Sequence, residues 1–178
     1  MIQEFIKHSR HFSYMSGIER DKLRVKETSE VFTPTKDIQE KLDILEKEDP
    51  ELFLNPNKTF LEPSCGDGQF LSEVIIRKIE RSGCTLEKAL STTYGVEIME
   101  DNVKLCKERL AGPNPTMKIL KILDKNIVCA DALTYDYSFG EPVGIEKWYA
   151  NLRALKQVVT GSSCLLYTSP SPRDGLLS

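Results

Sequence analysis

The stretch that decides the fold is TFLEPSCGDGQFL at positions 59–71. Thr59 to Glu62 has the short apolar pattern of a buried strand, and it runs directly into a turn that carries Gly66 and Gly68. Residues 69–81 then repeat apolar side chains at i and i+4 positions, which predicts a helix. A strand, a glycine turn and a helix in this order open a βαβ unit, so we expect parallel strands joined by helical crossovers.

The chain on both sides of this stretch continues the alternation of helices and strands. Before it, residues 35–48 place Ile38, Leu42 and Leu45 on one helical face, and Thr35 can cap that helix. After it, the sequence predicts a short helix over 86–90, a strand over 94–98, a helix over 101–110, helical turns over 117–123 and a third strand over 126–129. This pattern is typical of an α/β fold with a parallel sheet and flanking helices.

Polar side chains follow each of the three predicted strands. In an open α/β sheet, ligands bind at the carboxyl ends of the strands. The loop from Glu62 to Gly68 holds two acids, which would repel a phosphate and suit a cationic group or hydroxyls. Glu97 closes the second strand and can accept both hydroxyls of a ribose, and Asp131 follows the third and can accept from an exocyclic amine.

A ligand that combines an amino-acid cation, a ribose and an adenine fits these three strand ends, and S-adenosylmethionine is such a ligand. A nicotinamide dinucleotide is the rival, but its G-x-G-x-x-G fingerprint is incomplete here. After Gly66 and Gly68 its third position is Leu71. A purely structural turn with solvated acids is the remaining alternative.

Four segments resemble, in order, the motifs of the amino-group DNA adenine methyltransferases that place their cofactor-binding part first. Residues 31–34, VFTP, resemble the segment before the sheet. Residues 60–71, FLEPSCGDGQFL, resemble the signature loop written D-P-A/S-C-G-x-G-x-F-L. Residues 94–99, YGVEIM, with 101–103, resemble the ribose-binding segment, and residues 126–133, NIVCADAL, resemble the adenine-binding segment.

The resemblance covers roughly residues 27–140 and implies a Rossmann-like S-adenosylmethionine-dependent methyltransferase fold, with an incomplete parallel sheet. It also implies roles. Thr33 and the Pro34 backbone would hold the methionine end, beside the loop that includes Pro63, Cys65 and Gly66. Glu97 would take the ribose hydroxyls, Ile98 the adenine face and Asp131 the adenine amine. The expected cofactor-binding residues are therefore Thr33, Pro34, Glu62, Pro63, Cys65, Gly66, Gly68, Glu97, Ile98, Asp131 and Ala132.

The family's catalytic motif, N/D-P-P-Y/F, has no counterpart in this chain. Its Asn or Asp and a Pro carbonyl accept the hydrogens of the target amine, while its aromatic ring stacks on the flipped-out base. We therefore expect a chain that binds S-adenosylmethionine without transferring methyl groups. It would be the N-terminal portion of a site-specific DNA adenine-N6 methyltransferase of a restriction-modification or phage system, whose DNA-recognition region lies in a missing C-terminal part.

Other functions stay open at this point. A fragment of an RNA-adenine or protein-glutamine methyltransferase would share the sheet and the catalytic motif. A cofactor-binding regulatory module would use the stretch from Trp148 to Val159 as a partner helix. The segment at residues 31–34 favours the DNA enzymes.

Composition fits a globular protein. The net charge is -3 and 40% of the residues are apolar. No apolar run reaches the roughly 18 residues needed to span a bilayer, and the N-terminus lacks a signal-peptide pattern, so we expect a cytoplasmic protein with no membrane contact. The five cysteines form no CxxC pair and no Cys/His cluster, so neither a metal site nor a disulfide scaffold is expected.

The last residues differ from everything before them. Residues 164–174, CLLYTSPSPRD, resemble a translated transposase-type sequencing-library adapter, and residues 175–178 fit the index that would follow it. We therefore predict three parts: an N-terminal helical extension over 1–26, a partial cofactor-binding methyltransferase domain over 27–163, and a non-native tail over 164–178.

Overall fold

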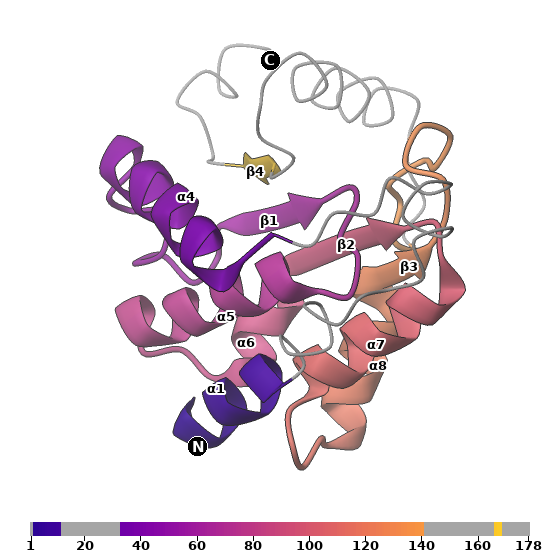
Figure 1. The fold of residues 1–178 in the computed structure, drawn as a ribbon, viewed down its shortest axis with the longest axis horizontal. Helices are drawn as coiled ribbons and strands as arrows, with labels where there is room; N and C mark the ends of the chain where they lie inside the picture. The colour runs from indigo at the N-terminus through magenta and orange to yellow at the C-terminus, as the bar shows by residue number, and fades with distance from the viewer. Residues whose placement is uncertain (1, 12–32, 141–165, 169–178) are drawn as a thin grey trace.

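The computed structural model describes residues 2–11, 33–140 and 166–168, which contain a four-stranded sheet in the order β3-β2-β1-β4 (Figure 1). The strands are β1 (Thr59–Glu62), β2 (Thr93–Glu97), β3 (Ile127–Cys129) and β4 (Leu166–Thr168). The first three are parallel, with Glu62 opposite Gly95 and Glu97 opposite Cys129. Their carboxyl ends therefore lie at one edge of the sheet.

Helices connect and cover these strands. They are α1 (Ile2–His11), α4 (Thr35–Glu48), α5 (Gln69–Ser82), α6 (Leu86–Ser91), α7 (Glu100–Ala111) and α8 (Met117–Asn126). The chain passes through α5 and α6 between β1 and β2, and through α7 and α8 between β2 and β3. These four helices lie together below the sheet in the view of Figure 1, with α1 beside them.

Three apolar clusters hold the layers together. The largest joins α1, α5, α6, α7 and α8 to the sheet, and a second lies between α4, α5 and β1 around Phe53 and Phe60. Side chains of a strand alternate between its two faces, so Gly95 faces the helices while Tyr94 and Val96 face the opposite side. There the third cluster forms, in which the Tyr94 and Phe139 rings lie 4.8 Å apart between centroids.

The predicted α/β architecture with parallel strands and flanking helices is confirmed, and the helix over 35–48 has the predicted bounds. The assignment of Asn126 to a strand is wrong, since α8 continues to this residue. The Asn126 side-chain amide is buried and donates to the carbonyl oxygens of Leu90 and Thr93, which ties the end of α8 to the start of β2.

The predicted cap of α4 is also wrong. Pro34 is the capping residue and makes no side-chain hydrogen bond, while Thr35 is already helical. The Thr35 hydroxyl instead accepts a hydrogen bond of 3.1 Å from the side-chain amide of Gln69, the first residue of α5. The starts of the two helices are therefore joined by this bond.

The sequence predicts a helical extension over residues 1–26, and residues 2–11 of this segment form α1. This helix is not solvated on all sides, because Phe5 and Ser9 are buried and Phe5 belongs to the largest core cluster. Its packing partners are α5 and α7. The helix is therefore part of the same packed unit as the sheet.

The outer edge of β1 carries β4, which pairs with it antiparallel and places Leu61 opposite Leu166. This strand belongs to residues 164–178, the segment that the sequence sets apart as adapter-derived. The pairing places residues 166–168 alone, and the adapter origin of residues 164–178 stays a prediction.

Four expectations fall wholly or mostly on residues outside those described. They are residues 12–26 of the helical extension, the family-like residues Val31 and Phe32, the partner helix from Trp148 to Val159, and the tail over 164–178 apart from residues 166–168. Among the residues that the structure does describe, no helix combines the length and the apolar character needed to cross a membrane.

Candidate functional site

The candidate site lies at the carboxyl ends of the three parallel strands, where Glu97 joins two of the predicted segments. One carboxylate oxygen of Glu97 accepts from the backbone N–H of Gly66 at 2.9 Å, and the other accepts from the N–H of Met99 at 2.9 Å. The Cys65 N–H donates to the Val96 carbonyl at 3.0 Å. The loop after β1 is thus fastened to the end of β2 through both backbone and side chain.

The loop itself is a tight turn that needs two glycines. Gly66 and Gly68 have φ angles of +52° and +82°, a region that side chains with a Cβ avoid. A Cβ on Gly68 would lie 2.6 Å from the Cys106 sulfur, so this glycine allows α7 to pack against the loop. A Cβ on Gly66 would meet no atom of the described residues within 4 Å, so these residues leave room for a ligand that approaches the Gly66 backbone.

Asp67 does not face a ligand, which corrects the expectation that both acids of this loop are available to a cation. It is buried, and its carboxylate accepts from the Arg109 guanidinium at 2.7 Å. Arg109 is itself fully buried on α7. Of the two acids in the loop, Glu62 is therefore the one left for a positively charged group.

Glu62 ends β1 and is almost completely buried. Burial raises the pKa of its carboxyl group well above the ordinary value, and the Ser64 N–H, which donates at 3.3 Å, lowers it only in part. A carboxyl group in this state gains most from a cationic partner, because the partner stabilises the ionised form that burial disfavours.

The Cys65 thiol points away from any ligand position and into the core. A Cβ on Gly95 would lie 2.8 Å from the Cys65 sulfur, and the thiol hydrogen-bonds to Cys106. This bond and burial raise the pKa of the Cys65 thiol well above its usual value. Such a thiol is unreactive, so Cys65 supports the loop through packing and through its backbone.

The ends of β2 and β3 add a second, more open part of the site. Ile98 is 64% exposed and Leu133 is 78% exposed, although both are large apolar residues. Asp131 is exposed too, and one of its carboxylate oxygens accepts from the Leu133 N–H at 2.9 Å. Exposed apolar side chains beside a hydrogen-bond acceptor suit a flat ring with an amino group. The sequence reasoning did not single out Leu133.

Thr33 and Pro34 stand immediately before α4, and the Pro34 carbonyl accepts from the Ile38 N–H in the first turn of that helix. Since Thr35 is bonded to Gln69, these residues are held near the start of α5, directly after the glycine loop. No hydrogen bond found among the described residues links Thr33 or Asp131 to Glu97. The structure thus brings the loop and Glu97 into contact, and leaves Thr33 and Asp131 at its margins.

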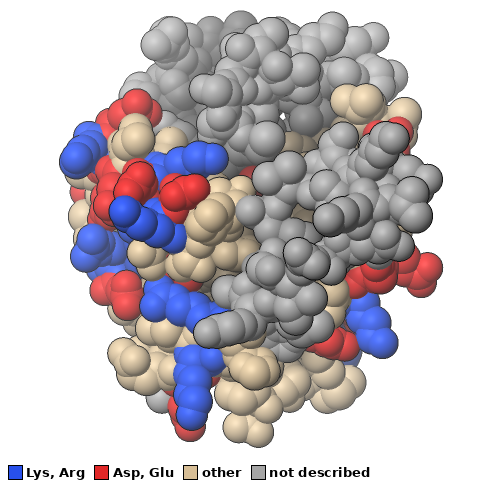
Figure 2. Space-filling model, viewed as in Figure 1, with Lys and Arg blue, Asp and Glu red and all other residues tan. Residues whose placement is uncertain are grey.

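The charged groups around the site do not form a cluster of metal ligands. Within the described ranges, no group of three or more His, Cys, Asp or Glu side chains could hold a metal ion. On the described part of the face in Figure 2, basic and acidic side chains alternate around α4.

Sequence reasoning missed Arg109, whose guanidinium forms an ion pair with the Asp67 carboxylate. The signal for it was present, because Arg109 lies three residues after Cys106 and so falls on the apolar face of α7. An arginine on such a face requires an internal acidic or carbonyl partner.

Comparison of the chain with protein-family models, with curated proteins and with solved structures gave no match.

Proposed function

We propose that the chain is the cofactor-binding portion of a site-specific DNA adenine-N6 methyltransferase and that it binds S-adenosylmethionine. The observation that carries the proposal is the bond between the Glu97 carboxylate and the Gly66 N–H. It joins two segments that resemble the cofactor motifs of that family, at the sheet edge where α/β proteins bind ligands. A Rossmann-like methyltransferase fold is part of the same proposal.

The chemistry of the ligand matches the order of the groups along this edge. The methionine end carries an ammonium group and a sulfonium, and it would lie beside Glu62 and the loop, with Thr33 and Pro34 closing that side. The ribose would lie over Glu97, since each of its carboxylate oxygens has bonded one N–H and retains a second lone pair for a hydroxyl. The adenine would lie against Ile98, with its amine donating to Asp131 and Ala132 nearby.

Methyl transfer needs groups that this chain does not carry. The lone pair of an adenine amine is delocalised into the ring, so the amine becomes nucleophilic only when acceptors orient its hydrogens in line with the sulfonium. The N/D-P-P-Y/F run that supplies those acceptors is absent from the sequence. We therefore propose cofactor binding without catalysis for this chain, and double-stranded DNA as the substrate of the whole enzyme through its recognition region.

The test is calorimetric titration of the whole chain with S-adenosylmethionine. We expect saturable binding that Glu97→Ala weakens by about tenfold or more, because two ribose hydrogen bonds to a charged acceptor are lost. Glu97→Gln should fall between the two, since an amide retains one acceptor oxygen. Glu48→Gln, an exposed carboxylate at the end of α4, is the matched control and should bind as the unsubstituted chain does. A chain that is folded by circular dichroism and gives no binding heat would overturn the proposal.

A further inference from the structure

Arg109 connects the glycine loop to the N-terminal helix, although it lies on neither. Its Nε donates to the backbone carbonyl of Asp67 at 2.9 Å, and one Nη donates to the Asp67 carboxylate at 2.7 Å. The other Nη donates to the carbonyl of Ser9 at 2.9 Å. One guanidinium therefore holds the side chain and the backbone of Asp67 and, at the same time, the last turn of α1.

The bond to Ser9 is a favourable one for both partners. The last four carbonyl groups of a helix have no partner inside the helix, and Ser9 belongs to that group because α1 ends at His11. A cation at the carboxyl end of a helix is also stabilised by the helix dipole. Among the described residues, Arg109 has at least one acidic and two carbonyl partners, and these partners favour its complete burial.

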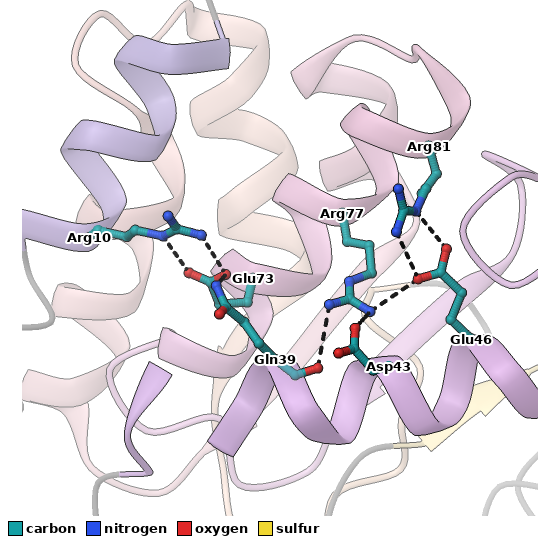
Figure 3. Close-up of polar contacts among 7 residues, drawn as sticks. All are labelled: Arg10, Gln39, Asp43, Glu46, Glu73, Arg77 and Arg81. Atoms are coloured by element: carbon teal, nitrogen blue, oxygen red, sulfur yellow. Dashed lines mark hydrogen bonds and ion pairs between the residues drawn. The ribbon is translucent and has the colours of Figure 1, made fainter. Parts of the chain in front are cut away.

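A second arginine holds α1 to the helix that follows the glycine loop. Arg10 makes a two-point contact with Glu73 on α5, with distances of 2.9 Å and 3.0 Å between the paired nitrogen and oxygen atoms (Figure 3). Gln39 on α4 donates to the same carboxylate at 3.2 Å. The end of α1 is therefore attached to the loop through Arg109 and to α5 through Arg10.

We infer that Arg109 is a positioning residue for the proposed cofactor site and that α1 is a structural part of that site. The inference rests on the proposed function. Arg109 neutralises Asp67 and keeps its carboxylate turned into the core, so that the loop presents the Gly66 backbone and Glu62 to the methionine end of the ligand. Helix α1 holds the Arg109 guanidinium through the Ser9 carbonyl, and it affects ligand binding through this contact.

The role differs from simple support of the fold because it concerns one end of the ligand. The loop would contact the methionine end, whereas Ile98 and Asp131 at the other strand ends would contact the adenine. A loop that has lost its anchor should therefore bind S-adenosylmethionine more weakly and adenosine, which lacks the methionine end, almost unchanged. General loss of structure would weaken the binding of both ligands together.

The experiment compares the two ligands by calorimetric titration of the full chain and three variants. Arg109→Lys retains the charge, but its single nitrogen cannot bridge three acceptors in a fixed plane. We expect about a tenfold loss in affinity for S-adenosylmethionine and less than about a twofold loss for adenosine. Arg10→Ala, which removes a half-exposed side chain, should give a smaller loss of about two- to threefold with the same selectivity. If Arg109→Lys does not fold, the comparison of the two ligands is made with Arg10→Ala alone.

Lys107→Met is the control, because Lys107 lies on the same helix and pairs with Asp124 at 2.9 Å outside the loop. It should bind both ligands as the unsubstituted chain does. Parallel losses for S-adenosylmethionine and adenosine in the arginine variants, or no loss in either, would overturn the inference while leaving the proposed function intact. Failure of the unsubstituted chain to bind S-adenosylmethionine would overturn the proposed function and the inference with it.

Discussion

At the scale of single residues, Lys78 is a cation that lies buried on α5, outside the candidate site. Its ammonium is completely buried and donates to the Lys58 carbonyl at 2.8 Å and to the Thr92 hydroxyl, and it lies 5.2 Å from the centre of the Phe60 ring. All three partners are neutral. Burial lowers the pKa of Lys78 to about 8 from the ordinary 10.5.

This shift predicts a pH dependence of stability. Between about pH 8 and about pH 10 the unfolded chain binds the Lys78 proton more tightly than the folded chain, so the free energy of unfolding should rise with pH in that window. Below about pH 8 the cost of burying the charge is present in full. Lys78→Met should remove this part of the rise, as measured by urea denaturation at several pH values, and Lys47→Met, at an exposed position on α4, should leave it unchanged. If the free energy of unfolding rises equally with pH in the Lys78 variant and in the unsubstituted chain, the lowered pKa of Lys78 is not the cause of the rise.

The residues of the candidate site divide into those that a sequence can reveal and those that it cannot. Glu97 and the loop glycines were predictable, because a carboxylate at a strand end and a strand-glycine-helix pattern are local features. The partner of Asp67 was not, since Arg109 lies 42 positions away and the pairing depends on how α7 packs against the loop. Local patterns identify which groups are present, and packing decides which of them face a ligand.

At the scale of elements, α4 and α5 are held together by two arginines that differ in burial. Arg77 is 13% exposed and lies 5.6 Å from the centre of the Phe53 ring, and it contacts Asp43 at 2.7 Å and Glu46 at 3.1 Å. Arg81 is 51% exposed and contacts Glu46 at 2.6 Å (Figure 3). The two side chains thus share one acid in different surroundings.

Their contributions to stability should therefore be unequal. Arg77→Ala removes packing against the Phe53 ring together with the ion pairs, and should lower the free energy of unfolding by about 2 kcal/mol. Arg81→Ala removes a solvent-screened pair and should cost about 0.5 kcal/mol or less. Urea denaturation of the two variants is the measurement, and a loss at Arg81 as large as that at Arg77 would contradict the argument.

The sequence was most informative about the positions of the helices. Helices α4, α5 and α7 have apolar faces with a clear helical period, and their predicted bounds agree with the observed ones to within a residue. The end of α8 was less clear, because Asn126 precedes two β-branched residues that favour a strand. The hydrogen bonds of its side chain to Leu90 and to Thr93, the first residue of β2, hold Asn126 at the end of α8, and they join positions that are more than 30 residues apart.

At the scale of the whole molecule, the sheet has an outer edge on β1 that β4 covers. If residues 164–178 are adapter-derived, as the sequence predicts, this pairing is a property of the printed chain and not of the natural protein. A chain that ends at Ser163 should then retain the fold and the affinity for S-adenosylmethionine. The reason is that the candidate residues lie between positions 33 and 132 and none of them belongs to β4.

Hydrogen exchange can detect the pairing directly. The Phe60 N–H donates to the Thr92 carbonyl, and successive N–H groups of a strand point to opposite edges, so the Leu61 N–H points toward β4. In the chain that ends at Ser163, the Leu61 amide should exchange at least about tenfold faster, because its partner strand is gone. The Phe60 amide should keep its protection and so serves as the internal control. Unchanged exchange at Leu61 would show that β4 does not cover this edge in solution, and faster exchange at both amides would show that the tail supports the sheet as a whole.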